Sequence, residues 1–241
     1  MTPKQFIAYY KQAFGENVEL PLGFWYSEES VAEPIEHKGC FISVFNTIVQ
    51  EGTTFSGKSE DISCPGGRLW SGFVPQRSNL AHFVSMTERF KKDEALAAEF
   101  LDGFPREEQA GKYINVARID KIETFDNLEG LIFFATPDIL SGLVSWCLFD
   151  TNEPDAVSVP FGSGCSSIIT QVLMENKNHT KRTFIGMFDP CARLCVEENI
   201  LTYAVPINRF KEMCETLVDT CLINTTKDWQ KVKDRIEGKK P

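Results

Sequence analysis

The chain has 241 residues and a formal net charge of −9 at pH 7, with 42% hydrophobic and 24% charged residues. This composition is typical of a globular protein that is long enough to bury a substantial core. The acidic balance argues against nonspecific nucleic-acid binding, which needs a basic face, and no stretch reaches the roughly 18 consecutive apolar residues of a membrane span. We therefore expect neither a nucleic-acid nor a membrane partner.

The N-terminal stretch MTPKQFIAYYKQAF lacks an apolar region followed by a small-residue cleavage site. We therefore expect no secretory signal and a cytoplasmic location. Thiols stay reduced in that compartment, so the eight cysteines are expected to be buried apolar residues, metal ligands or catalytic thiolates instead of disulfides.

A helix is predicted first along the chain, over residues 3–14, because Phe6, Tyr10 and Phe14 recur at helical spacing and Gly15 follows them. The rest of the first half is predicted to contain a strand at 19–25, a polar loop at 28–37, a buried helix at 41–49, a strand beginning at 53–55, a turn at 65–67 and one long helix at 79–101.

Strands and helices alternate more regularly in the second half. The pattern predicts strands at 113–119, 130–135, 156–159, 183–188 and 201–205, and helices at 139–149, 165–176, 190–198, 208–221 and around Trp229. Such alternation predicts an α/β (or α+β) fold, a layered mixed sheet with flanking helices, with parallel neighbours in the C-terminal half. No linker rich in Pro, Ser or Gly divides residues 1–241, so a single domain is predicted.

Two stretches of the chain, 39–69 and 164–194, resemble each other. Each opens with Gly-Cys, passes through an apolar segment and Thr-Phe-x-Gly, and reaches a second cysteine. The paired cysteines are Cys40 and Cys64 in the first stretch and Cys165 and Cys191 in the second, 24 and 26 residues apart. Two pseudo-repeated halves would bring these four thiols near one axis, although the identities are few and chance similarity is the alternative.

The four paired cysteines stand at predicted helix starts or beside a glycine turn. Cys165 follows Gly164, Cys191 follows a capping Asp189 and a proline, and Cys64 precedes Pro65. Unpaired backbone N–H groups and the helix dipole favour thiolate at such positions. The alternative for each is a buried apolar cysteine. Of the remaining four cysteines, Cys195 is a possible extra ligand, and simple packing is expected of Cys147, Cys214 and Cys221.

Two functions follow from these residues. In the first, Cys40, Cys64, Cys165 and Cys191 hold an iron–sulfur cluster, zinc or another soft metal, or they carry out thiol redox chemistry. In the second, a non-catalytic module binds a small anionic ligand at the Gly162–Cys165 helix start with Arg193. The residues expected to bind that ligand are Gly66, Gly162, Ser163, Gly164, Asp189 and Arg193. The sequence leaves open whether the protein is an enzyme, and its substrate and oligomeric state.

Residues 52–59, GTTFSGKS, fit the phosphate-binding P-loop pattern letter for letter. That loop requires a helix that opens at the Lys-Ser end. Here two acidic residues follow Ser59, and Pro65 and two glycines come soon after. We therefore expect the match to be a coincidence.

Four short motifs, HKGC, EDISCPGG, FGSGC and DPCAR, resemble those of domain of unknown function family 169. Members typically show a Cys before an apolar helix, then a Glu-Asp-x-x-Cys-x-Gly stretch, then a strand and helix that end in a polar Cys or Asp turn with Arg. The matching residues in this chain are Cys40, Glu60, Asp61, Cys64, Gly66, Gly164, Cys165, Asp189, Cys191 and Arg193. The resemblance implies a shared fold and a shared pocket, and it implies no particular reaction.

Overall fold

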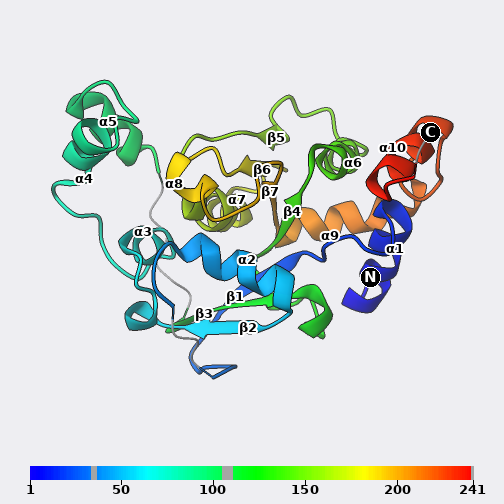
Figure 1. Ribbon diagram of the computed structural model, residues 1–241, viewed down its shortest axis with the longest axis horizontal. Helices are drawn as coiled ribbons and strands as arrows, with labels where there is room; N and C mark the ends of the chain where they lie inside the picture. The colour runs from blue at the N-terminus through cyan, green and yellow to red at the C-terminus, as the bar shows by residue number, and fades with distance from the viewer. Residues whose placement is uncertain (34–36, 105–110, 240–241) are drawn as a thin grey trace.

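A seven-stranded mixed sheet forms the centre of the protein in a computed structural model, which describes residues 1–33, 37–104 and 111–239 (Figure 1). The strand order is β2-β3-β1-β4-β7-β6-β5, and only the β5·β6 pair is parallel among the pairs of this sheet. The strands are β1 (Leu22–Ser27), β2 (Thr54–Gly57), β3 (Tyr113–Arg118), β4 (Gly130–Ala135), β5 (Val157–Ser158), β6 (Thr183–Gly186) and β7 (Leu201–Pro206).

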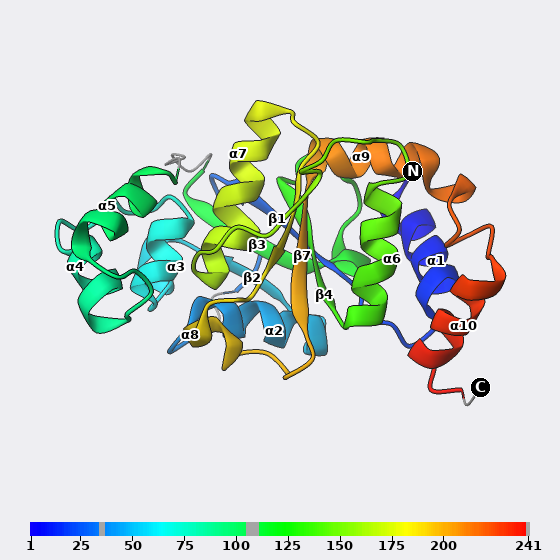
Figure 2. The ribbon, with the colours of Figure 1, turned by 90° about the horizontal axis from the view of Figure 1, so that it is seen from above.

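Helices cover both faces of the sheet (Figure 2). One face carries α2 (Phe41–Glu51), α3 (Pro65–Trp70), α7 (Gln171–Asn178), which continues a π-helical segment at Ser166–Thr170, and α8 (Pro190–Arg193). The other carries α1 (Pro3–Phe14), α6 (Pro137–Cys147), α9 (Ile207–Thr216) and α10 (Lys227–Ile236). The short α4 (Leu80–His82) and α5 (Glu94–Asp102) lie together beside α3, at one end of the molecule (Figure 2).

Alternation along the strands divides the apolar residues between two cores. In β4, Ile132 and Phe134 face the core under α2 and α7, whereas Leu131 and Phe133 face the core under α1, α6 and α9. This is the two-residue period of a strand buried on both faces. The predicted layered mixed sheet with flanking helices is therefore confirmed, and α1 and β4 keep the bounds that the sequence predicted.

The prediction of parallel neighbours in the C-terminal half is largely wrong. Both β4·β7 and β6·β7 are antiparallel. A parallel crossover needs a long connection, usually a full helix. Between β6 and β7 the chain forms only the four-residue α8, so β7 returns beside β6 in the opposite direction.

The predicted helix over 190–198 is therefore too long. It ends at Arg193, whose guanidinium donates hydrogen bonds to the backbone carbonyls of Glu197 and Glu198 at 3.0 and 2.6 Å. A side chain thus satisfies two carbonyl groups that would lie in the last turn of the predicted range, where a helix leaves its carbonyls without backbone partners.

The predicted helix over 79–101 is broken in the middle. A π-helical segment, Phe83–Thr87, follows α4, and α5 starts only at Glu94. Arg89 between them adopts a left-handed φ of 61°, and the Asp93 side chain caps α5 by accepting the Leu96 N–H at 2.8 Å. This cap starts a new helix, which periodicity alone does not reveal.

The two halves of the sheet share one topology. Outward from the central β1·β4 pair, the order is β1, β3, β2 on one side and β4, β7, β6 on the other. In chain order, α2 precedes β2 and α7 precedes β6, and both helices pack on the same face. A duplication would produce this arrangement, but the same topology can arise without one, so the repeat stays a prediction.

The P-loop match does not have the geometry of a phosphate site. Strand β2 ends at Gly57, and only a three-residue 3-10 turn, Ser59–Asp61, follows. The helix N-terminus that would present N–H groups to a phosphate at Lys58 is absent from this described segment.

The C-terminal helix α10 packs against α1 through Trp229, which is 7% exposed. The Trp229 ring lies edge-on to the Phe14 ring, with 5.6 Å between the ring centroids. Thr226 caps this helix by accepting the Trp229 N–H at 3.2 Å. We expect Thr226→Ala to lower the free energy of unfolding by about 1 kcal/mol, because the cap is lost. Urea denaturation would measure this, with the exposed Thr225→Ala as the control. Equal stability of the two variants would contradict the cap's contribution.

Candidate functional site

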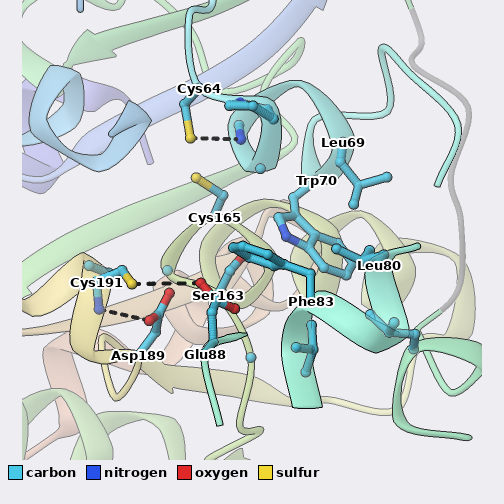
Figure 3. Close-up of a pocket in the computed structure, with 18 of the residues that line it drawn as sticks. Cys64, Leu69, Trp70, Leu80, Phe83, Glu88, Ser163, Cys165, Asp189 and Cys191 are labelled. Carbon is cyan, nitrogen blue, oxygen red and sulfur yellow. Dashed lines mark hydrogen bonds between the residues drawn. The ribbon is translucent and has the colours of Figure 1, made fainter. Parts of the chain in front are cut away.

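A pocket of about 330 Å³ opens between α3, the α4–α5 region and the two chain segments 161–165 and 189–192 (Figure 3). Its lining includes the four cysteines that the sequence paired, Cys40, Cys64, Cys165 and Cys191. Within the described residues, chain segments more than a hundred positions apart thus contribute sulfur atoms to one cavity.

Cys40 and Cys64 are brought together by two helix starts. Cys40 is the N-cap residue of α2, and Cys64 is the N-cap residue of α3, with Pro65 at the first helical position. The predicted turn at 65–67 is therefore the first turn of a helix, a place where proline is favoured. Gly67 allows the close approach of α3 to α2, since a Cβ atom there would lie 2.7 Å from the Cβ of Phe41.

The surroundings of Cys64 favour its thiolate form. Hydrogen bonding from the Cys40 thiol lowers the pKa of Cys64 to about 5, assisted by the backbone N–H groups of Gly67, Phe41 and Gly66 and opposed by burial. The Gly67 N–H lies 3.4 Å from the Cys64 Sγ (Figure 3). The same contact and burial raise the pKa of Cys40. The pKa values of the two thiols therefore move in opposite directions, which favours the thiolate at Cys64.

Cys165 is a neutral thiol at the same pocket wall. Its side chain is 4% exposed, and burial raises its pKa well above the usual value, with further contributions from Cys64 and Asp189. This corrects the expectation of a thiolate at Cys165, because burial outweighs the helix-start effect. Gly164 explains the proximity of this segment to α2 and α8. A Cβ there would lie 2.7 Å from the Ala192 Cβ and 2.9 Å from the Ile42 Cγ1.

Cys191 stands at the exposed side of the pocket between two carboxyl groups. Its backbone N–H donates to Asp189 at 2.9 Å, and its thiol donates to Glu88 at 3.7 Å (Figure 3). Desolvation and these negative groups raise the pKa of Cys191. Burial and the nearby Asp189 also raise the pKa of Glu88. A thiolate at Cys191 is therefore disfavoured as well, in contrast to the sequence expectation.

Five of the six residues predicted to bind an anion line the pocket, and Arg193 does not. Its guanidinium donates to the carbonyls of Glu197, Glu198 and Ile200. The Ser163 hydroxyl accepts a hydrogen bond from the Ser166 N–H at 3.2 Å, so this backbone donor at the helix start is already paired within the protein. The lining residues among the five are Gly66, Gly162, Ser163, Gly164 and Asp189.

The pocket's apolar wall was missed by the sequence reasoning. It comes from residues 70–101, between the two similar stretches, and includes Trp70, Leu80, Phe83 and Phe100. Phe83 is 43% exposed, so part of this wall faces solvent. The concentration of aromatic residues in this segment was the available signal.

Among the described residues, no three or more His, Cys, Asp or Glu side chains are arranged to hold a metal ion. The iron–sulfur and zinc expectations for Cys40, Cys64, Cys165 and Cys191 stay predictions, and the arrangement adds no support to them. Cys147, Cys214 and Cys221 pack as expected: Cys147 is buried in the core under α6, and Cys214 and Cys221 lie against it. Cys195, the possible extra ligand, is half-buried against the core of the opposite face, and its role as a ligand stays a prediction.

No described helix has both the length and the apolar character that crossing a membrane requires. No curated protein and no solved structure matches the chain. A family model, domain of unknown function family 169, described as uncharacterised ArCR, matches residues 18–216. This range contains both similar stretches and all four pocket cysteines. The chain therefore belongs to domain of unknown function family 169.

Proposed function

We propose that the pocket is a thiol redox site, in which Cys64 is the attacking thiolate and Cys40 the resolving thiol. One observation carries the proposal: Cys40 and Cys64 are the N-cap residues of two adjoining helices at one pocket wall, and the Gly67 N–H donates to the Cys64 Sγ at 3.4 Å. The interaction with Cys40 and with backbone N–H groups lowers the pKa of Cys64. A thiolate is the reactive form in disulfide exchange, and a neighbouring thiol is what a two-step exchange requires.

The proposed reaction is the reduction of a disulfide to two thiols. The Cys64 thiolate attacks one substrate sulfur, so a Cys64–substrate S–S bond forms, the substrate S–S bond breaks, and the leaving thiolate takes a proton from solvent. Cys40 then loses its proton to solvent and attacks the Cys64 sulfur, which releases the second substrate thiolate to be protonated. The substrate gains two electrons, and the protein pair becomes a Cys40–Cys64 disulfide. External thiols restore the reduced pair by the reverse exchange.

The anionic-ligand alternative has weaker support. Its one predicted cation, Arg193, is hydrogen bonded to backbone carbonyls outside the pocket lining. Besides the exposed Arg77, the pocket lining includes the less exposed carboxyl groups of Glu88 and Asp189. These groups repel an anion.

A trapping experiment tests the redox proposal. The reduced protein, in a Cys191→Ser background because Cys191 is exposed, is treated with one equivalent of 4,4′-dithiodipyridine and mapped by peptide mass spectrometry. We expect a Cys40–Cys64 disulfide. Adding Cys40→Ser is expected to stop the reaction at a mixed disulfide on Cys64, since the resolving thiol is gone.

Two further variants complete the test. Cys64→Ser is expected to abolish both products at this pair, whereas Cys214→Ser, against the opposite core, is expected to react like the parent protein. Modification of other cysteines while Cys40 and Cys64 stay reduced would overturn the proposal.

A further inference from the structure

The pocket is walled mainly by aromatic and aliphatic side chains. In the view of Figure 3, Leu69, Trp70 and Leu80 lie on one side, and Cys191 and Asp189 lie on the other. Phe161 closes another part of the lining and packs edge-on against Phe90, with ring centroids 5.7 Å apart. Such a surface gains free energy by covering apolar ligand atoms.

The charged lining residues among the described part of the chain are Arg77, Glu88 and Asp189. Arg77 is exposed, whereas Asp189 is only 7% exposed and Glu88 is half-buried. Lys91 is not in the lining, and its ammonium lies 4.2 Å from the centroid of the Phe100 ring. The acidic lining residues therefore lie on the more buried side of the pocket, and the basic one lies on its exposed side.

The volume sets the size of the ligand. The cavity measures about 330 Å³, and an apolar cavity of roughly 150 Å³ accommodates benzene. The pocket thus has room for a molecule of about two aromatic rings.

We infer that the pocket takes an uncharged, largely apolar small molecule with about two aromatic rings and discriminates against its anionic counterparts. The inference rests on the proposed function only where it concerns the reaction. If the redox function holds, the substrate that this pocket selects is a neutral aromatic disulfide. The recognition itself depends on the walls and on the charge of Asp189.

Binding of two matched thioethers tests the inference. The probes are 4-(phenylthio)benzyl alcohol, which is neutral, and 4-(phenylthio)benzoate, which is anionic, and both are titrated into the reduced wild-type protein by calorimetry. Neither probe contains an S–S bond, so neither reacts with Cys64. We expect the alcohol to bind at least about tenfold more tightly than the benzoate, because the carboxylate meets like charge in a partly buried site.

Three variants assign the preference to the pocket. Asp189→Asn keeps an oxygen to cap the Cys191 N–H and removes the charge, so benzoate binding should strengthen about threefold or more while alcohol binding stays unchanged. Phe83→Ala shortens an exposed wall residue and should weaken binding of both probes. Asp228→Asn, on the exposed surface of α10 away from the lining, should change neither.

Benzoate binding as tight as that of the alcohol, or no detectable binding of either probe, would overturn the inference, and tighter benzoate binding would favour the anionic-ligand module instead. Loss of the preference in Asp228→Asn, or unchanged binding in Phe83→Ala, would also overturn it. The outcome is independent of the trapping experiment. Alcohol binding without a Cys40–Cys64 disulfide would retain the ligand class and remove the redox chemistry.

Discussion

Alkylation of Cys64 by iodoacetamide is expected to proceed at a rate that stays nearly constant above about pH 6. The rate follows the thiolate fraction, which rises with pH through the pKa and is flat above it, and the pKa of Cys64 is lowered to about 5. An ordinary thiol with a pKa of about 8.5 instead gains roughly tenfold in rate per pH unit below that value. Peptide-resolved mass spectrometry of pulse-labelled protein would measure both profiles in one sample.

The shape of the profile is the test, and the absolute rate is not. A thiolate of low pKa is intrinsically less nucleophilic, with a Brønsted coefficient of about 0.4–0.5. Cys64 is therefore expected to exceed an ordinary cysteine modestly near pH 6 and to react more slowly than one near pH 9. Cys191 is an internal control, since its pKa is raised and its labelling should still increase over this range.

Two substitutions at position 40 separate the causes of the lowered pKa. Cys40→Ala removes the thiol hydrogen bond, which is the largest cause, so the Cys64 profile should shift to higher pH. Cys40→Ser keeps a donor and should shift it less. A Cys64 profile that rises across the whole range in the wild type, or that is the same in the wild type and Cys40→Ala, would contradict the assignment.

Local patterns predicted the positions of the cysteines better than their chemistry. Cys40, Cys64 and Cys165 were all expected at helix starts or beside a glycine turn, and all line the pocket. Their protonation differs, because it depends on long-range packing. Cys64 receives N–H groups from two helices that start 24 residues apart in sequence, at Phe41 and Pro65, whereas Cys165 is enclosed.

The secondary-structure predictions likewise succeeded where the local pattern was continuous and failed where single residues changed the chain direction. The helix over 3–14 has apolar residues at helical spacing and the strand over 130–135 is one short apolar run, and the structure confirms both ranges. The helix predicted over 79–101 was wrong because one residue with left-handed backbone, Arg89, and one capping residue, Asp93, redirect the chain. Glu88 and Phe90, which lie at that break, line the pocket. The same break therefore explains why the sequence predicted one long helix over 79–101 and did not predict the pocket wall that this segment forms.

Gly67→Ala is expected to lower the free energy of unfolding and to raise the pKa of Cys64. Gly66→Ala is expected to cause neither of these losses. Neither glycine has a positive φ, so the backbone accepts alanine at both positions. At position 67 the added methyl would lie 2.7 Å from the Phe41 Cβ and 2.9 Å from the Ile62 Cγ2, which forces α3 away from α2. Overpacking of this kind costs about 1–3 kcal/mol, and urea denaturation would measure it.

The matched glycine makes the result specific. At position 66 the nearest atoms to the added methyl are the Cys64 Sγ at 3.8 Å and the Trp70 Cδ1 at 3.9 Å, which are ordinary contacts. Alanine keeps the backbone N–H and is the better helix former, so Gly66→Ala should be as stable as the parent or slightly more so. If the two helix starts jointly hold Cys64 as a thiolate, the alkylation profile must shift to higher pH in Gly67→Ala alone. Equal profiles in the two variants would mean that the contact between α2 and α3 does not determine the charge of this sulfur.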